Sequence, residues 1–495
     1  MDLKNIIHIG YLGMVLGGGL MGCNGHPVEP LEETLVVTQR QVFHLPARPA
    51  VDFLFIIDSS PSMREEQVAL ARNVAEFAGF FVGARSAFDF RIAVTTPDLA
   101  VAQPGAFAHT AAADPPAYEP PAAIDLADCR ALEAEGALGP VLDPDAIEAA
   151  CAASEADDAC LQAELSRRFT CLAVRGTDGD PYEKGLEAMR QALSCAGPNA
   201  GLWSACCTPE GYDPACRPAV PPDFLRPHAK LVVVIVSDED DCSDQPGAHL
   251  AEGGLNGCIW QRDQLVPVAD YVRFLQGLKA DPQHDLVVAT VVGHDILTAE
   301  GVPPTYAPGP ELEGCDPNHP TQSLEVCCPG GVCTGGARVV CEATGARAGT
   351  RYLELAEAFG RAGLGCPAGA EGTEACLSVC AEDFAAPVQQ ILTAAQQVRF
   401  CLDPRPACTV GDRPCSSLEL GQPGHYALQV TVGCTDAESA AAGSGCAGGP
   451  RRRLAAEAFQ FDPLASDCGS AAAITLAVPP PAGGAVWVDY RVETP

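Results

Sequence analysis

Apolar residues gather along this chain in short, nearly continuous runs, and stretches with a helical period separate them. Four runs predict buried β-strands, at residues 51–57, 88–96, 230–241 and 286–293. Strands that are apolar at almost every position are buried on both faces, which is typical of a parallel sheet covered by helices. Because strands and helical segments alternate, the sequence predicts an α/β fold.

Apolar residues spaced three or four positions apart predict the covering helices. In the helix expected at 63–82, one face carries Leu70, Val74, Phe77 and Phe81. The same period predicts further helices at 144–167, in the second part of 176–193, and at 266–279, 351–362 and 382–398.

The pattern divides the chain into four parts. Residues 1–23 have the character of an export signal, and residues 24–47, polar and without a firm period, predict a tether. Residues 48–400 hold the α/β domain, with disulfide-rich insertions and a loop expected at 98–125. Residues 401–495 contain cysteines and short alternating segments such as HYALQVTV and AVWVDYRV, which predict a small β module.

The amino-acid composition limits the kinds of molecule that this protein is expected to bind. The 495 residues include 64 acidic and 30 basic side chains, for a formal net charge of −34. This charge argues against nucleic acid, whose phosphates would be repelled, and against electrostatic binding to anionic lipid head groups. The 25 cysteines favour an oxidising compartment outside the cytosol.

The N-terminal segment supports export. Residues 5–22 are mostly apolar and end in Leu20-Met21-Gly22, directly before Cys23. This arrangement resembles the lipobox of bacterial lipoproteins, which implies that Cys23 is acylated and becomes the anchor; the alternative is an ordinary secretory signal. Without Cys23, 24 cysteines remain, enough for 12 disulfides. No other segment is apolar for about 18 residues, so we expect membrane attachment through lipid alone. By the same resemblance, Asn24 after the anchor favours the outer membrane of a Gram-negative bacterium.

Oxygen-bearing side chains follow the predicted strands at their carboxyl ends, where ligands bind in open parallel sheets. Asp58, Ser60 and Ser62 follow the first strand, Thr177 precedes a helix, and Asp238 follows the VVVIV run. Carboxylates and hydroxyls without His or Cys suit a hard cation, so the sequence predicts a Mg²⁺ or Mn²⁺ site, with Ca²⁺ as a further option.

The D-x-S-x-S pattern of residues 58–62 resembles the metal-ion-dependent adhesion site of von Willebrand factor type A domains. The resemblance covers roughly residues 48–400 and implies a doubly wound, Rossmann-like α/β fold with a mostly parallel sheet. It also implies that Asp58, Ser60, Ser62 and Thr177 coordinate the cation, that Asp238 acts mostly through water, and that one coordination position stays open for a partner's carboxylate. Two departures are Pro61, where glycine is common, and the long insertion before Thr177, which leaves Asp178 and Asp180 as rivals.

Other interpretations of the same residues stay open. Ser62 and Glu65 also fit a capping box, which needs no metal. The acidic run from Asp238 to Asp244 fits either a calcium loop or, more simply, a solvated acidic loop pinned by Cys242. The adjacent cysteines Cys206 and Cys207 could bind zinc, although export favours disulfides.

The function expected from the sequence is a lipid-anchored, exported adhesion module, not an enzyme. Its divalent cation would bridge to a protein or other ligand that presents a carboxylate. One alternative is a structural envelope lipoprotein with a vestigial site. A metal-dependent hydrolase is a weaker alternative, because the sequence holds neither H-E-x-x-H nor G-x-S-x-G nor an evident general base.

Overall fold

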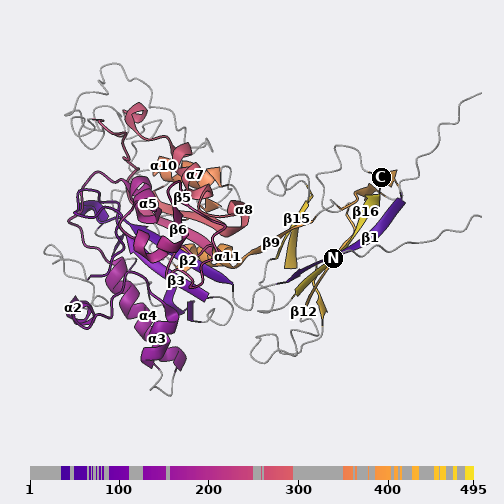
Figure 1. Ribbon diagram of the computed structural model, residues 1–495, viewed down its shortest axis with the longest axis horizontal. Coiled ribbons are helices and arrows are strands. Elements are labelled where there is room, and N and C mark those ends of the chain that lie inside the picture. Colours follow the sequence, from indigo (N-terminus) through magenta and orange to yellow (C-terminus); the bar gives the residue numbers. More distant parts are fainter. Residues whose placement is uncertain are drawn as a thin grey trace, which may run out of the picture.

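The computed structural model describes the chain in segments (Figure 1). The described residues are 35–44, 49–63, single positions within 66–82, 89–110, 126–151, 157–248, 258, 261–293, 349–359, 363–364, 377, 379, 385–402, 406–410, 413–414, 426–433, 451–455, 458–463, 472–476 and 485–494. They form a mixed α/β unit and a group of antiparallel β-sheets that contains both the first and the last described strands.

A five-stranded parallel sheet is the centre of the α/β unit. Its spatial order is β3-β2-β6-β7-β8. The strands are β2 (Ala50–Ile57), β3 (Asp89–Thr95), β6 (Lys230–Ser237), β7 (Leu286–Val292) and β8 (Gly363–Leu364). All neighbouring pairs are parallel. This confirms the predicted parallel α/β arrangement and the four predicted strands.

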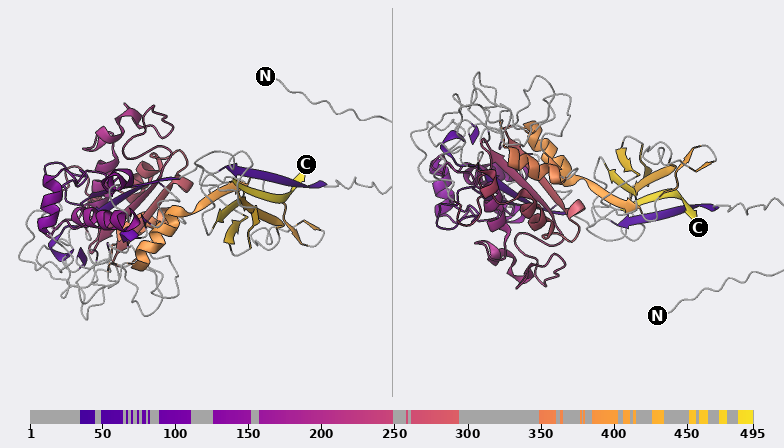
Figure 2. Two further views of the ribbon diagram at one scale, coloured as in Figure 1. Left: turned by 90° about the horizontal axis from the view of Figure 1, so that it is seen from below. Right: turned by 90° about the horizontal axis from the view of Figure 1, so that it is seen from above.

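Alternate residues of β2 pack on opposite faces of the sheet. Phe53 and Phe55 face a cluster that includes Leu70, Val74 and Phe77 of the predicted helix, whose described positions within 66–82 are helical. Leu54 and Ile56 face a second cluster. The first face is covered by α4 (Asp157–Ala173) and α11 (Ala385–Gln396), and the second by α5 (Gly185–Leu193), α7 (Val268–Gln276) and α10 (Thr350–Ala358) (Figure 2).

Disulfides staple the insertions, as the sequence predicts. The helical insertion contains α2 (Leu126–Ala134), α3 (Pro144–Cys151) and α4, and it is cross-linked by Cys129–Cys171 and Cys151–Cys160. The neighbouring cysteines 206 and 207 bond to different partners, in Cys206–Cys216 and Cys195–Cys207, which excludes a zinc site there. Cys242–Cys258 is the fifth described bridge. Shorter elements in this unit are η1 (Pro61–Met63), η2 (Ala200–Cys206), β4 (Cys207–Thr208), β5 (Gly211–Tyr212), η4 (Arg262–Gln264) and α8 (Pro282–Asp285).

The C-terminal β module is built around a sheet of order β1-β16-β12-β13 and a second of order β14-β15-β9, with β10 and β11 paired separately. A shared core joins Phe400, Val430, Ile474 and Val488. The remaining strands are β9 (Val398–Leu402), β10 (Thr409–Val410), β11 (Arg413–Pro414), β12 (Leu428–Gly433), β13 (Arg452–Arg453), β14 (Phe459–Asp462), β15 (Ala472–Leu476) and β16 (Ala485–Thr494).

The prediction of a tether over residues 24–47 is wrong for Leu35–His44, which form β1. This strand pairs with β16 along its whole length, from Leu35 opposite Thr494 to His44 opposite Ala485. Four consecutive polar residues, Thr38 to Gln41, interrupt the alternation that identifies a strand in sequence. Pairing with β16 stabilises this strand in spite of its weak local pattern. Arg40 of β1 also forms an ion pair with Asp489 of β16.

A buried ion pair lies near the amino ends of the parallel strands. Arg226, 2% exposed, donates to Asp52, 0% exposed, through both its Nε (2.8 Å) and its backbone N–H (2.7 Å). Its Nη1 donates to Asp89 of β3 at 2.5 Å. The loop before β6 is therefore fixed to both β2 and β3.

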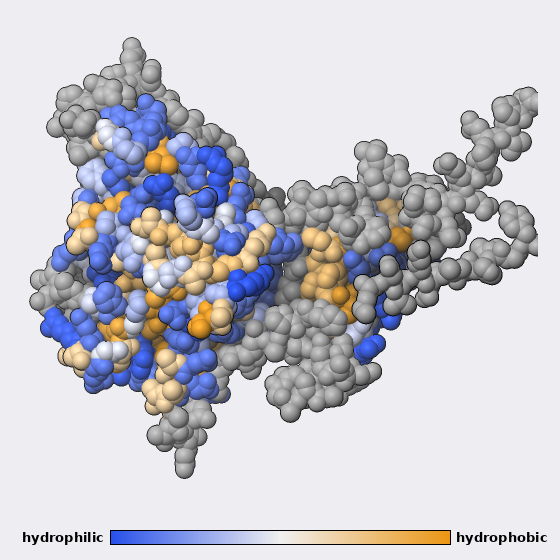
Figure 3. Space-filling model, viewed as in Figure 1, coloured by the Kyte–Doolittle hydropathy of each residue, from blue (hydrophilic) through white to orange (hydrophobic). Residues whose placement is uncertain are grey.

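The surface of the α/β unit mixes hydrophilic and hydrophobic residues (Figure 3). Among the described residues, the exposed large apolar side chains are Val42, Val101 and Val220, which come from separate segments. No helix in the described ranges is long and apolar enough to cross a membrane.

Candidate functional site

The site begins where β2 and β6 end side by side. Their parallel register sets Ile57 opposite Val236, and the backbone N–H of Asp58 donates to the carbonyl of Val236 at 3.0 Å. The next residue of each chain segment is therefore held at the same edge of the sheet. This adjacency brings Asp58 next to Ser237 and Asp238, although 180 residues separate the two aspartates.

Hydrogen bonds link four of the five predicted ligands. Asp58 Oδ1 accepts from the backbone N–H of Ser60 at 2.8 Å. The hydroxyls of Ser60 and Ser62 are 2.9 Å apart, and Ser62 Oγ donates to Asp238 Oδ1 at 3.2 Å. Ser237 Oγ donates to Asp58 Oδ2 at 2.6 Å, a contact that the sequence does not reveal. Residues 58–62, which we call the serine turn, are thus folded back onto the end of β6.

The loop that carries Thr177 packs against the serine turn. The backbone N–H of Gly179 donates to the carbonyl of Ser59 at 2.8 Å, and a Cβ on Gly179 would lie 2.5 Å from Ser59 Oγ, so glycine is required for this approach. Gln67 fastens the loop: its Nε2 donates to the carbonyls of Asp58 (2.8 Å) and Gly176 (2.7 Å).

Thr177 itself is half-buried next to this contact. In the described part of the chain it forms no hydrogen bond with the other four predicted ligands. Of its rivals, Asp178 is exposed, and Asp180 is half-buried with its Oδ1 accepting from the backbone N–H of Tyr182 at 2.9 Å. The loop therefore meets the serine turn through Gly179 and is joined to Gln67 through Gly176, with Thr177 between these two glycines.

Two buried acidic residues that the sequence did not predict also belong to the site. Glu183 is 1% exposed, and its carboxyl is in hydrogen-bonding contact with that of Asp58. Glu66 is 2% exposed and lies near enough to Asp238 to act on its charge. Acidic residues near helix starts are common on surfaces, so neither has a sequence signal that marks it as buried.

The carboxyl groups of the site resist ionisation. Burial raises the pKa of Asp238 to about 8, and the neighbouring charges of Asp58, Glu239 and Glu66 add to the effect. Burial, followed by the charges of Asp58 and Glu239, raises the pKa of Glu183 well above its ordinary value. Burial also raises the pKa of Asp58, although the hydrogen bond from Ser237 opposes this. Like charges that lie close together in a low-dielectric interior repel one another, and binding a proton or a cation removes this repulsion.

The donor set fits a hard divalent cation with few carboxylate ligands. The oxygens are carboxylates and hydroxyls, the types that Mg²⁺ and Mn²⁺ prefer. Asp238 Oδ2 and Glu183 Oε1 are buried and have no hydrogen-bond partner among the described residues. Within the same residues, no three His, Cys, Asp or Glu side chains are grouped closely enough to hold a metal directly. Direct ligation would therefore rest on two aspartates with serine hydroxyls and water.

The acidic residues that follow Asp238 after β6 each have a different set of partners. Asp240 accepts from the backbone N–H of Arg351 at 2.7 Å, at the start of α10. Asp241, 0% exposed, accepts from Arg351 Nε at 2.9 Å and from the backbone N–H of Leu186 at the start of α5. Asp244 pairs with Lys184 at 2.6 Å.

The expected solvated loop is thus wrong for Asp241, which is buried and paired. These three carboxylates are engaged by cationic side chains and helix ends, which leaves the calcium-loop hypothesis without ligands of its own. The run contributes Asp238 to the site, with Glu239 beside it.

Two candidates from the sequence fall outside the described residues. One is Cys23, with the signal segment. Glu65 also lies outside them, so the capping-box hypothesis is tested only on Ser62, whose hydroxyl contacts Ser60 and Asp238.

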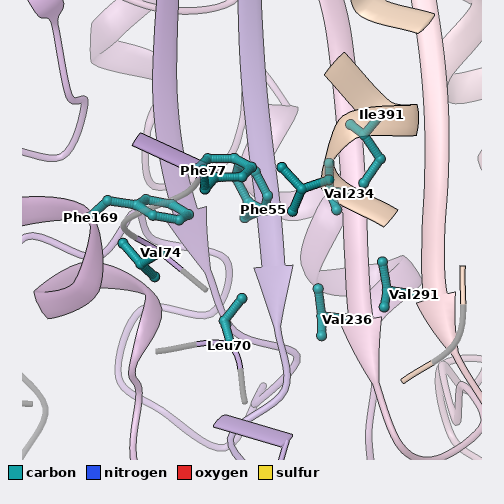
Figure 4. Close-up of a pocket in the computed structure, with 10 residues that line it drawn as sticks. Phe55, Leu70, Val74, Phe77, Phe169, Val234, Val236, Val291 and Ile391 are labelled. Carbon is teal, nitrogen blue, oxygen red and sulfur yellow. The ribbon is translucent and has the colours of Figure 1, made fainter. Parts of the chain in front are cut away.

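A small cavity lies deeper on the first face of the sheet, as Figure 4 shows. Its volume is about 20 Å³, and all of its lining side chains are apolar, among them Phe55, Phe77 and Val236. Space for a single water without polar partners is a packing void of the core. It is not a ligand pocket.

Comparison with known proteins does not assign a family. No family model matches the chain, and no curated protein matches it. Two crystal structures of the pilus adhesin SpaC from Lactobacillus rhamnosus GG, one in an open conformation, are similar over 92% of this chain, at 8% and 9% identity with TM-scores of 0.28 and 0.27. The chain spans 42% and 43% of those adhesin chains. Scores this low carry no argument about fold or function.

Proposed function

We propose that this protein is an exported, lipid-anchored binding module of the von Willebrand factor type A kind, with a doubly wound α/β domain. Its cation site comprises Asp58, Ser60, Ser62, Thr177 and Asp238. A Mg²⁺ or Mn²⁺ ion held there bridges the protein to a carboxylate on a protein or other ligand. The module catalyses no reaction.

One observation carries the proposal: the hydrogen-bonded chain that runs from Asp58 through Ser60 and Ser62 to Asp238, at the carboxyl edge of neighbouring parallel strands. Strand order supports it as well. The chain passes from β2 to β3 on one side and then to β6 on the other, so the winding reverses between β2 and β6, where ligands bind in such sheets.

The charge of the protein makes the cation essential to the proposed role. A protein of net charge −34 repels an acidic ligand, and without a cation the site presents only carboxyls and hydroxyls to it. A bound divalent ion reverses the local sign and supplies the attraction. In this role the serine hydroxyls orient the two aspartates, and Gln67 holds the Thr177 loop beside them.

Capture on carboxylated beads tests this function. We expect the wild-type protein to bind in Mn²⁺ and to be released by EDTA, and we expect Asp58→Ala to bind no better than background. Glu210→Gln, which removes one exposed charge from the turn between β4 and β5, is the matched control and should bind like the wild type. Equal capture of the wild type and Asp58→Ala in Mn²⁺ would favour the structural-lipoprotein alternative.

A further inference from the structure

We propose that Glu183 is a positioning carboxylate of the cation site that accepts a hydrogen bond from a cation-bound water. The inference rests on the proposed function and adds a residue outside the D-x-S-x-S, Thr and Asp pattern. Its ligand is a hydrated divalent cation.

The first argument is that one oxygen of the buried Glu183 carboxyl has no hydrogen-bond partner among the described residues. Glu183 is 1% exposed, and this oxygen is its Oε1. Leaving a buried polar atom unsatisfied costs roughly 1–3 kcal/mol, and more for a charged group. Asp238 Oδ2 is the other site carboxylate oxygen in this condition. Two such oxygens next to each other's charges point to a shared electropositive partner.

The second argument is the way the backbone fixes this side chain. The carbonyl of Glu183 accepts from the N–H of Cys242 at 2.5 Å, so residue 183 is tied to the segment that carries Asp238. On its C-terminal side, Asp241 Oδ1 accepts from the N–H of Leu186 at 3.0 Å, and Ser243 Oγ accepts from the N–H of Glu187 at 2.9 Å. These contacts hold the start of α5 against the loop after β6, with the Glu183 carboxyl at that of Asp58.

The third argument decides between direct and water-mediated contact. Because no three acidic side chains of the described residues are grouped closely enough to bind one ion directly, we assign Glu183 to a water of the ion and not to the ion itself. Mg²⁺ and Mn²⁺ retain several waters when few carboxylates bind them, and a buried carboxylate is a strong acceptor for such a water. Outer carboxylates of this kind typically change metal affinity by roughly 10–100-fold.

The test compares Mn²⁺ affinity by electron paramagnetic resonance of free Mn²⁺ in wild-type protein, Glu183→Gln, Glu210→Gln and Asp58→Ala. We expect Glu183→Gln to weaken binding by about tenfold or more, the exposed Glu210→Gln to leave it unchanged, and Asp58→Ala to abolish it. Binding by Glu183→Gln within about threefold of the wild type would overturn the inference while leaving the proposed function intact. Absence of binding in the wild type would overturn both.

A second measurement separates this role from a general structural one. The thermal midpoint of each protein is compared in EDTA and in saturating Mn²⁺. Glu183→Gln should be at least as stable as the wild type in EDTA, because the amide replaces a buried carboxyl that lies among other acidic groups, and it should gain less from Mn²⁺. If Glu183→Gln does not fold, Glu183→Asp takes its place, and an Asp variant with wild-type Mn²⁺ affinity would refute the inference.

Discussion

Neutralising Asp238 should stabilise the metal-free protein while removing its cation binding. Asp238 is 0% exposed, and its charged neighbours within the site are acidic, so the folded state holds it protonated. In the unfolded chain the same group ionises freely. Asp238→Asn keeps an oxygen that can accept a hydrogen bond from Ser62 Oγ. It also removes the free-energy cost of keeping the buried carboxyl protonated in the folded state.

The magnitude follows from the pKa of Asp238, about 8 in the folded protein against an ordinary 3.8. At pH 7 the folded state must keep a proton that the unfolded chain has lost, which costs at most about 4 kcal/mol of unfolding free energy at about 1.4 kcal/mol per pH unit. The cost is absent below the ordinary pKa and grows as pH rises toward 8. At pH 4.5 it is only about 1 kcal/mol.

The assay is urea unfolding in EDTA at pH 7 and at pH 4.5, read by hydrogen exchange of peptides that cover β2 and β6. We expect Asp238→Asn to be more stable than the wild type by up to about 4 kcal/mol at pH 7 and by only about 1 kcal/mol at pH 4.5. Glu210→Gln, at an exposed position outside the site, should change neither value. A variant no more stable than the wild type at pH 7 would refute the reasoning, because the buried carboxyl would then carry no such cost.

Three further predictions test other parts of the account. Asp52→Ala leaves the 2% exposed Arg226 without its closest carboxylate and should cost roughly 3–5 kcal/mol in the same urea assay; a loss below about 1 kcal/mol would contradict a stabilising pair. Val74→Ile adds a methylene beside the cavity of about 20 Å³ and should raise the unfolding free energy by about 0.8 kcal/mol, whereas a loss would mean that the void cannot take the extra carbon. Mn²⁺ affinity should rise by up to about tenfold per pH unit between pH 6 and 8, because the ion must displace the proton of Asp238, and a flat calorimetric profile would rule that competition out.

The sequence predicts the α/β unit well because its signals are local. Continuous apolar runs identify β2, β6 and β7, and the spacing of Leu70, Val74 and Phe77 identifies a core-facing helix surface. The local pattern shows only that Asp58 and Asp238 each follow an apolar strand, and their adjacency is what the resemblance to type A domains implies.

What the sequence does not predict depends on distant partners. β1 has a polar centre and becomes a strand because β16 pairs with it along ten residues. Asp241 looks like part of a solvated acidic run, yet Arg351, 110 residues away, neutralises it in the interior. Glu183 looks like an ordinary residue before a helix, and only the fold shows it buried against Asp58.

The central claim is that the serine turn and Asp238 bind a divalent cation. Calorimetric titration of Mn²⁺ into metal-stripped protein, beside Asp58→Ala, tests it most directly. The account predicts saturable binding near one equivalent in the wild type and none in the variant. Identical titrations of the two proteins would contradict it and would leave the serine turn as a helix start that contacts β6 for structural reasons.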